Sequence, residues 1–511
     1  MLIHTLFAGS RYAAGSLGVL LLVAAAGMPV SSLANEDGRH FIFQHGSVIG
    51  DLQCPIKRKP SQAPRPASGD VLEPPDAEEL DELGLLTTRL GKPSLLDQDT
   101  TQSASFITRP GVVRSQPLRV GIWGDSHLAA GSFSYELKRI FQAQGVKART
   151  QFIPLTMGRA GVNLPLRRHC MDGWKSELAY VARNAGIPTG VGLNTLQGDG
   201  DAYLWFDLRN ENGEADVSSV ELFFHQSPAG GSVSISIDDG PENKVSLSGT
   251  KGFGALTIVG SRPLSLLKLR VSELPVQLNG MFLNYRQTPV ATLDSFGIPG
   301  ATVRAWQQLD PGYFSAYFKD RSYDLVMLEY GTNEGNATPF DAAGYAKTLE
   351  QSLKNLRQVF PQSECLLIAP GDRGILVPRA RKIRKSGKSV HAQKSKDRHA
   401  VRPRASHEYT AVDLLRFSAI HEKIFTIQKE IGARYGCSTW SMQTAMGGQG
   451  SAYAWQLSNP SLMSKDLIHF TIKGYQRLAQ ELAASLGWKN DAALPASAVP
   501  AEKTGDDGAS K

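Results

Sequence analysis

The residues with the clearest chemical potential are a serine, a histidine and an aspartate. Ser126 lies in a Gly-Asp-Ser-His sequence at 124–127, directly after a short apolar run. A serine hydroxyl is a weak nucleophile until a base takes its proton, which a neutral imidazole does near pH 7. Asp466 and His469 suit that task, because their spacing lets the imidazole face a nucleophile while the carboxylate fixes its tautomer. Each motif alone is equally typical of helix capping or of a surface histidine.

Three further groups could stabilise an oxyanion. The backbone N–H of Ser126 would begin a helix, where the positive end of the helix dipole lies. Gly300 belongs to a Gly-Ile-Pro-Gly-Ala-Thr turn at 297–302 that can present a bare N–H. Asn333, in Tyr-Gly-Thr-Asn-Glu at 330–334, carries an amide that donates without titrating. Taken singly, these are also an ordinary turn and a loop asparagine bonded to its own backbone.

Such distant residues need a scaffold that brings them to one edge. Apolar runs predict buried strands at 118–123, 324–330 and 364–369, and amphipathic spacing predicts helices at 411–435 and 471–486. Strands alternating with helices favour an α/β fold with a doubly wound parallel sheet, which places ligands at the carboxyl ends of its strands. The sequence has no G-x-S-x-G elbow, no P-loop and no dinucleotide-binding glycine motif.

One region breaks this alternation. Residues 232–237 alternate polar and apolar side chains before an Asp-Asp-Gly turn, and residues 267–271 alternate again. Several short strands at this spacing predict an inserted β-sandwich, with an elaborated β-edge of a single domain as the alternative. The expected organisation is a signal peptide at 1–34, an N-terminal extension with a Pro-rich linker at 35–115, the α/β domain at 116–194 and 289–487, the inserted sandwich at 195–288, and a disordered tail at 488–511. Within the extension, the acidic segment 76–86 predicts a short helix.

The N-terminus is typical of an exported protein. Arg11 precedes an apolar stretch at 13–27, and Ser32-Leu33-Ala34 supplies the small residues that a signal peptidase requires. We expect cleavage after Ala34, with an uncleaved anchor as the alternative. The mature protein should then be periplasmic or secreted, with no stable transmembrane span.

The chain has four cysteines, in a compartment where disulfides can persist. Cys54, Cys170, Cys365 and Cys437 allow three full pairings, among which the sequence does not choose. The apolar surroundings of Cys365 and Cys437 favour small buried thiols at these two positions. No close Cys/His pairs suggest a metal site, and no cofactor is expected.

The net charge of +7 is concentrated in one tract. Residues 379–404 contain eleven Lys/Arg and one acid, a charge of +10, so the rest of the chain carries −3. The protein as a whole therefore does not have the composition of a nucleic-acid-binding protein. The surrounding basic loop, 376–405, is expected to be a solvated loop; the alternative is an electrostatic contact with an anionic envelope surface.

Taken together and in this order, the four motifs resemble the diagnostic blocks of the SGNH hydrolases, a branch of the GDSL esterase/lipase superfamily. The resemblance spans 116–194 and 289–487, and is greatest to the peptidoglycan O-acetylesterase group. The motifs that carry it are Gly124-Asp125-Ser126-His127 followed by Ala130-Gly131, Gly331-Thr332-Asn333-Glu334, Met446 to Ser451 with Trp455, and Asp466 to Tyr475. The chain departs from the pattern at Glu334, where many members have Asp.

The resemblance implies an SGNH, flavodoxin-like sheet and a carbohydrate-binding type of sandwich. It implies that Ser126 is the nucleophile, His469 the base and Asp466 the orienting carboxylate, with Ser126, Gly300 and Asn333 forming the oxyanion hole. The implied partner is an acetylated glycan polymer, and the implied reaction is removal of O-acetyl groups, with peptidoglycan as the expected substrate. Two alternatives stay open: an acetyltransferase that uses the same residues, and a non-catalytic glycan-binding protein. Trp455 and the loop 447–450 are either part of a substrate groove or core packing.

Overall fold

A computed structural model of the protein describes residues 32–35, 38–46, 50–55, 71–86, 117–379 and 409–488. The expected signal peptide lies outside these residues apart from its last three positions. The same holds for most of the Pro-rich linker, for the basic loop beyond residue 379 and for the tail after Trp488. No helix in the described part of the chain is long and apolar enough to cross a membrane.

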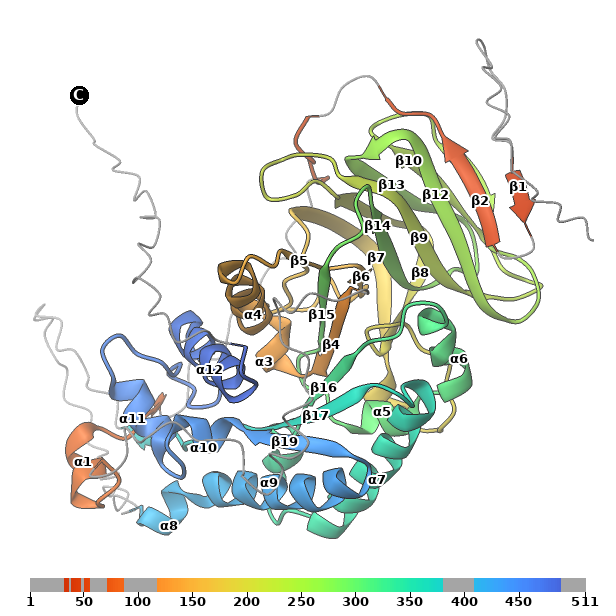
Figure 1. Cartoon of the computed structure of the whole chain (residues 1–511). Helices are drawn as coiled ribbons and strands as arrows, with labels where there is room; N and C mark the ends of the chain where they lie inside the picture. Colours follow the sequence, from red (N-terminus) through yellow and green to blue (C-terminus); the bar gives the residue numbers. More distant parts are fainter. Residues whose placement is uncertain are drawn as a thin grey trace, which may run out of the picture.

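The centre of the α/β part is a six-stranded sheet in which all neighbours are parallel (Figure 1). Its strand order is β19-β17-β16-β4-β15-β5. The strands are β4 (Leu118–Gly124), β5 (Ala148–Arg149), β15 (Ala291–Gly297), β16 (Leu325–Glu329), β17 (Glu364–Ala369) and β19 (Cys437–Ser441). Three apolar runs that the sequence predicted as strands are β4, β16 and β17, and the expected α/β fold class is confirmed.

Helices cover both faces of this sheet. Alternate residues of a strand point to opposite faces, so Ile122 of β4 enters one hydrophobic cluster and Trp123 enters the other. The first cluster is closed by α4 (Ser132–Ala143), α10 (Met442–Met446), α11 (Ser451–Leu457) and α12 (Ile472–Ser485). The second is closed by α5 (Arg304–Gln308), α6 (Pro311–Ser315), α7 (Ala342–Val359) and α9 (Arg416–Arg434).

The predicted helix at 411–435 is in fact two helices, because Leu415 separates α8 (Ala411–Leu414) from α9, which begins at Arg416. Gly436 follows α9 with a φ of +65°, the left-handed conformation expected of a C-terminal cap. The acidic segment forms α1 (Ala77–Glu82) as predicted, with a capping box between Asp76 and Glu79. Smaller elements are α3 (Ser126–Ala129), the 3₁₀ turns η2 (Ala179–Val181), η3 (Ala316–Phe318) and η4 (Glu334–Asn336), and the pair β3 (Val71–Glu73) and β18 (Val377–Arg379).

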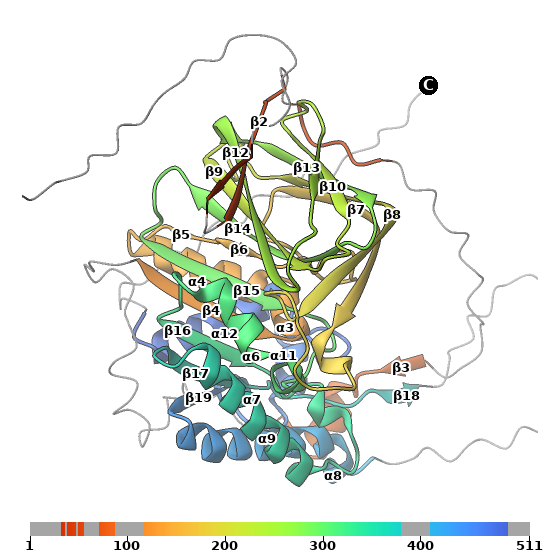
Figure 2. The same cartoon turned by 90° about the vertical axis from the view of Figure 1, so that its right-hand side faces the viewer.

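A second sheet of eleven strands curls around its own apolar core, beside the parallel sheet (Figure 2). All its neighbours are antiparallel except β2 and β12. The strands are β1 (Ser32–Asn35), β2 (Gly38–Phe43), β6 (Phe152–Ile153), β7 (Arg168–Leu178), β8 (Asn194–Asp207), β9 (Val217–Gln226), β10 (Ser232–Ile237), β11 (Asn243–Ser246), β12 (Gly252–Leu264), β13 (Leu266–Glu273) and β14 (Gln277–Tyr285). The expected strand at 232–237 is β10. The sheet also includes β1, β2, β6 and β7 from outside 195–288, and the domain boundaries stay a prediction.

All four cysteines are paired, as Cys54–Cys170 and Cys365–Cys437. The interpretation of Cys365 and Cys437 as free buried thiols is therefore wrong. The two residues lie directly opposite each other on the neighbouring strands β17 and β19, with their Cα atoms 4.5 Å apart. Strand register brought them together, and sequence spacing does not reveal register.

Candidate active site

Ser126 occupies the first position of α3, immediately after the central strand β4. Asp125 caps this helix by accepting a hydrogen bond from the His127 N–H. The turn is tight, because a Cβ at Gly124 would come within 2.5 Å of the Glu329 carboxylate on β16. Glycine at this position therefore lets the two strands end side by side and raises the serine at the carboxyl edge of the sheet.

Ser126, His469 and Asp466 form a continuous hydrogen-bonded chain. The Ser126 Oγ lies 2.9 Å from the His469 Nε2, and the His469 Nδ1 lies 2.7 Å from an Asp466 carboxylate oxygen. Because Nδ1 faces the carboxylate, it carries the proton, and Nε2 is left with a lone pair that can accept the serine proton. The other Asp466 oxygen accepts the N–H groups of Ile468 and His469, at 3.0 and 2.9 Å.

The turn that carries Asp466 and His469 is held in a conformation that few residues adopt. Leu467 has a φ of +56°, which costs about 1–2 kcal/mol for a residue with a side chain. Its side chain is fully buried in the sheet cluster, and its carbonyl accepts the Gly374 N–H at 3.1 Å. Burial and this bond offset the strain and fix the carboxylate and the imidazole relative to the serine.

The charges of this pair are stabilised by their contact. The hydrogen bond with Asp466 raises the pKa of His469 above its usual value of 6.5, against the opposing effect of burial. Partial burial would raise the pKa of Asp466, but the hydrogen bonds from His469 and Ile468 prevail and lower it to about 2. Asp466 is therefore ionised at any physiological pH and can stabilise an imidazolium.

Two backbone N–H groups near the serine, those of Ser126 and Gly300, make no hydrogen bond with any described residue. Gly300 follows β15 and has a φ of +81°, and it is exposed. The predicted Gly/Pro turn therefore does present a bare donor, and the structure brings it to the same edge of the sheet as Ser126.

Asn333 also reaches this edge, but its amide is engaged. Its Nδ2 donates to the Asp125 carboxylate at 3.1 Å and to the Ala301 carbonyl at 2.9 Å. Donation to an oxyanion would therefore have to be shared with one of these acceptors.

Glu334 joins the two loops that carry these donors. One of its oxygens accepts the Val303 N–H at 2.7 Å and the other accepts the Gly331 N–H at 3.1 Å. Burial raises the pKa of Glu334 to about 7. The sequence marked this residue only as a departure from the family pattern, since its positioning role depends on which loops meet.

Two more carboxyl groups lie beneath the serine, wholly buried. Burial raises the pKa of Asp125 to about 6, and burial together with the charge of Asp125 raises the pKa of Glu329 well above its usual value. The Asp125 N–H donates to Glu329 at 3.1 Å, while the other oxygen of Glu329 has no partner among the described residues. Because these two groups cannot both ionise at low cost, we assign the proton to Glu329.

His127 and Trp455 support the site from within. The His127 ring packs on Phe470 and lies 3.2 Å from the Tyr475 hydroxyl, and burial lowers its pKa to about 3, so it stays neutral. Trp455 is only 3% exposed and donates to the Met446 carbonyl. The interpretation of Trp455 as a groove residue is wrong, because its ring faces the core.

Arg373 is a neighbour that the sequence did not reveal. It follows β17, lies over the Phe417 ring at 4.2 Å and contacts Asn336, and its charge opposes the protonation of His469. A polar Gly-Asp-Arg-Gly run after a buried strand was the available signal. Elsewhere in the described ranges, no three His, Cys, Asp or Glu side chains lie close enough to hold a metal ion.

No family model matches the sequence, and a search of curated proteins gives no match. Among solved structures, a peptidoglycan O-acetylesterase superimposes with a TM-score of 0.52 at 22% identity, covering 76% of this chain and 94% of that chain. A family two carbohydrate esterase with a carbohydrate binding domain, from Corynascus thermopiles (Myceliophthora fergusii), gives a TM-score of 0.24 at 11% identity over 61% of this chain and 100% of that chain. The second likeness is too loose to bear on the fold, whereas the first shows that the chain shares the α/β fold of that esterase structure.

Proposed function

We propose that the protein is a serine esterase that removes O-acetyl groups from an envelope polysaccharide, with O-acetylated peptidoglycan as its substrate. The observation that carries the proposal is the hydrogen-bonded chain from Ser126 through His469 to Asp466, with distances of 2.9 and 2.7 Å. The fold likeness to a peptidoglycan O-acetylesterase supports the choice of substrate.

In the first half-reaction, His469 Nε2 takes the proton of Ser126 as Oγ attacks the acetyl carbon. The resulting imidazolium is held by the Asp466 carboxylate, whose pKa of about 2 keeps it ionised. His469 then gives the proton to the departing sugar oxygen, which leaves an acetyl group on Ser126.

The negative charge of the tetrahedral intermediate needs donors that are already in place. The free N–H groups of Ser126 and Gly300 meet that need, and Asn333 would add a third donor by sharing its amide. Glu334 supports this arrangement by tying the loop after β15 to the loop after β16.

In the second half-reaction, water activated by His469 releases acetate. The His469 side chain is 39% exposed, so water can approach the imidazole. This exposure favours hydrolysis over the rival reaction, in which a glycan hydroxyl accepts the acetyl group, because a transferase must exclude water.

We further propose that the protein acts in the periplasm or outside the cell. The two disulfides and the N-terminal signal pattern support this location. In the same proposal, the part of the eleven-stranded sheet at 195–288 is an inserted sandwich of the carbohydrate-binding type.

The test is acetate release from O-acetylated peptidoglycan, xylan and alginate by the wild type and by Ser126→Ala. The wild type should release acetate, fastest from peptidoglycan, and the variant should release none above background. Ser272→Ala, a change of an exposed serine on β13, serves as the matched control and should behave as the wild type. Retention of activity in Ser126→Ala would refute the assignment of the nucleophile. If the wild type does not hydrolyse even a simple aryl acetate, the protein is not an esterase and the alternative of a non-catalytic glycan-binding protein is favoured.

A further inference from the structure

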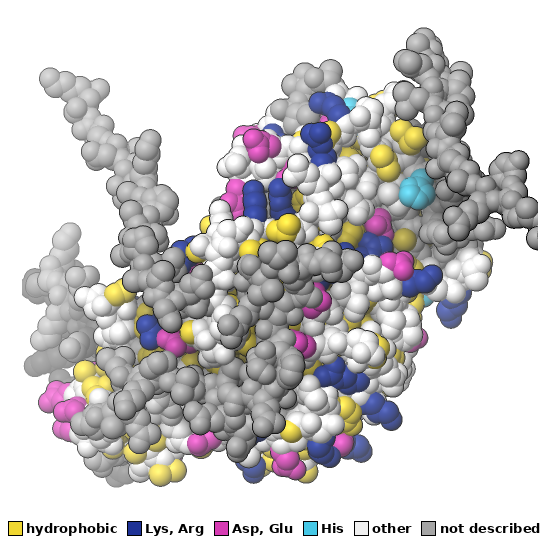
Figure 3. All heavy atoms as spheres, in the orientation of Figure 1, with side chains coloured by type: hydrophobic (Ala, Val, Ile, Leu, Met, Phe, Trp, Pro, Cys, Tyr) yellow, Lys and Arg dark blue, Asp and Glu magenta, His cyan; other side chains and the backbone are white. Residues whose placement is uncertain are grey.

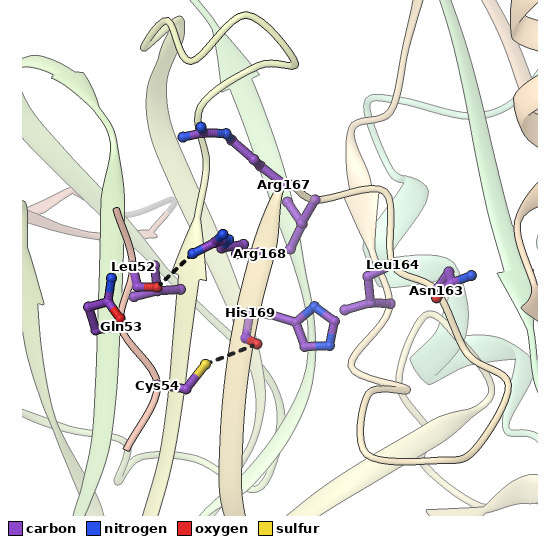
Figure 4. A pocket seen from close by; sticks show the side chains of 9 residues that line it. Leu52, Gln53, Cys54, Asn163, Leu164, Arg167, Arg168 and His169 are labelled. Carbon is purple, nitrogen blue, oxygen red and sulfur yellow. Dashed lines mark hydrogen bonds between the residues drawn. The ribbon is translucent and has the colours of Figure 1, made fainter. Parts of the chain in front are cut away.

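A cleft of about 560 Å³ lies between the N-terminal segment and the start of β7 (Figure 4). One wall is the N-terminal segment Leu52–Cys54, and the other is formed by the loop at 163–167 and the start of β7, Arg168 and His169. In Figure 4 the His169 ring points toward Leu164. Among the described residues, neither Asp nor Glu lines the cleft.

The first wall is fixed in place by a covalent bond and a buried side chain. The Cys54–Cys170 disulfide joins the segment to β7, and Leu52, only 3% exposed, packs with Cys170 and Leu266. The cleft is therefore built by long-range contacts rather than by a single loop.

The opposite wall is attached to the helix that begins with Ser126. The Asn163 N–H donates to the Ala129 carbonyl at 2.8 Å, and its side chain donates to the Ala130 carbonyl at 3.0 Å. Ser126 and Ala129 are the two ends of α3, about 4.5 Å apart along the helix axis at a rise of 1.5 Å per residue. In the same loop, Arg159 donates to the Pro299 carbonyl, next to Gly300.

The cations of the cleft are incompletely neutralised. Arg167 makes long contacts of 3.3 and 3.4 Å with Asp51 and Asp207, and Asp207 is already bound by Arg209 at 2.6 Å. Arg168 contacts only a carbonyl, that of Leu52 at 3.5 Å, and has no ion pair with any described residue. Both arginines are exposed, whereas on the face shown in Figure 3 basic and acidic side chains are interspersed.

The remaining lining residues suit an organic anion rather than a bare ion. Leu164 and Leu166 supply apolar surface, and Gln53, Asn163 and His169 supply neutral hydrogen-bonding groups. Burial lowers the pKa of His169, which therefore adds no charge at neutral pH. An arginine fork matches the two oxygens of a carboxylate.

We propose that this cleft binds a carboxylate carried by the same polymer, next to the sugar whose acetyl ester reaches Ser126. The inference rests on the proposed function, and it narrows the substrate to acetylated glycans that bear carboxylates. The carboxylate can belong to the sugar ring, as in a uronic acid, or to a peptide-bearing branch, as in peptidoglycan.

The kinetic test compares Arg168→Ala with Arg434→Ala, which removes the same charge from the exposed end of α9. For Arg168→Ala we expect the KM for a carboxylate-bearing acetylated glycan to rise about tenfold, the worth of one charge-assisted hydrogen bond, with little change in kcat. The KM for acetylated xylo-oligosaccharides without uronic acid should not rise. Arg434→Ala should match the wild type on every substrate, and 0.5 M salt should shrink the effect of Arg168→Ala.

The two charged substrates distinguish the source of the carboxylate. A rise in KM on acetylated alginate alone assigns the cleft to a ring carboxylate, and a rise on acetylated peptidoglycan alone assigns it to the branch. An unchanged KM on both, or an equal rise on the neutral oligosaccharides, would overturn the proposal.

A binding measurement separates this inference from the proposed function. Calorimetry with alginate oligosaccharides and with de-O-acetylated peptidoglycan fragments compares Ser126→Ala with the double variant Ser126→Ala/Arg168→Ala. The double variant should bind one of the two about tenfold more weakly. Equal Kd values for both ligands contradict the cleft, whereas failure of the wild type to release any acetate contradicts only the esterase.

Discussion

Two groups of carboxyl side chains surround Ser126, and their surroundings shift their pKa values in opposite directions. Asp125 and Glu329 are wholly buried below the serine and Glu334 is partly buried beside them, and burial raises the pKa of each. Asp466 lies on the other side, 44% exposed at its side chain, and its hydrogen bonds lower its pKa to about 2. Residues of one chemical kind are thus divided by environment into a scaffold and a charge.

This division has a mechanistic meaning. A carboxylate that must stabilise an imidazolium has to remain ionised, which requires donors and some contact with water. Carboxyl groups that only hold loops together work as well when they share protons, since they then avoid the cost of a buried charge. The comparison therefore predicts that removing the charge of Asp466 lowers activity strongly, whereas removing the carboxyl group of Glu329 lowers it little.

The largest effect is expected from the outer group. In Asp466→Asn the amide can donate to His469 Nδ1, which forces the proton onto Nε2 and leaves no lone pair for Ser126. We expect kcat/KM for an aryl acetate to fall about 10³–10⁴-fold, while the thermal midpoint changes little. A loss of less than tenfold would show that the charge of Asp466 is not needed.

A smaller loss of activity is expected from a change at Asn333, whose amide contacts Asp125 of the buried group. Asn333→Ala removes one candidate oxyanion donor and also the amide that Asp125 and Ala301 accept from. We expect kcat to fall about 10²-fold with a nearly constant KM, the typical cost of one such donor. A rise in KM with an unchanged kcat would assign Asn333 to substrate binding instead.

The pH profile sharpens the same comparison. Activity requires neutral His469, whose pKa is raised above 6.5 by Asp466, so kcat/KM should decrease about tenfold per unit as pH falls below that raised value. Asp466, with a pKa of about 2, does not titrate in this range. Asp125, with a pKa of about 6, loses its charge as pH falls and then supports the imidazolium less. An acid limb with its midpoint below pH 6 would contradict the strong contact between His469 and Asp466.

The smallest effect is expected from Glu329→Gln. Since we assign the proton to Glu329, an amide can replace it and still accept the Asp125 N–H. We expect kcat/KM to remain within about threefold of the wild type, since isosteric replacement of a neutral group keeps this hydrogen bond. A loss as large as that in Asp466→Asn would mean that Glu329 also supplies charge, and the contrast between Glu329 and Asp466 would fail.

The sequence predicted the residues of the candidate site more fully than the residues that hold them in place. Ser126, Gly300 and Asn333 could be located because each follows an apolar strand, and parallel strands bring such ends to one edge. Asp466 and His469 were recognisable from local spacing before an amphipathic helix. Each of these features depends on only a few consecutive residues, so it can be predicted from the sequence alone. The structure brings all five residues together.

What the sequence did not reveal depends on which segments meet. The Cys365–Cys437 bond follows from the register of β17 and β19. The role of Glu334 follows from the approach of the loops after β15 and β16, and the burial of Trp455 from the direction in which α11 presents its ring. Single side chains in a sequence carry no information on such encounters.

The central claim is that one hydroxyl, activated by one imidazole, forms the acyl enzyme. The most direct measurement is covalent labelling of the intact protein with a serine-reactive fluorophosphonate, followed by peptide mapping, in the wild type and in His469→Ala. The account predicts a single modification at Ser126 that is lost in His469→Ala. Modification of another residue, or equal labelling of Ser126 in both proteins, would contradict it.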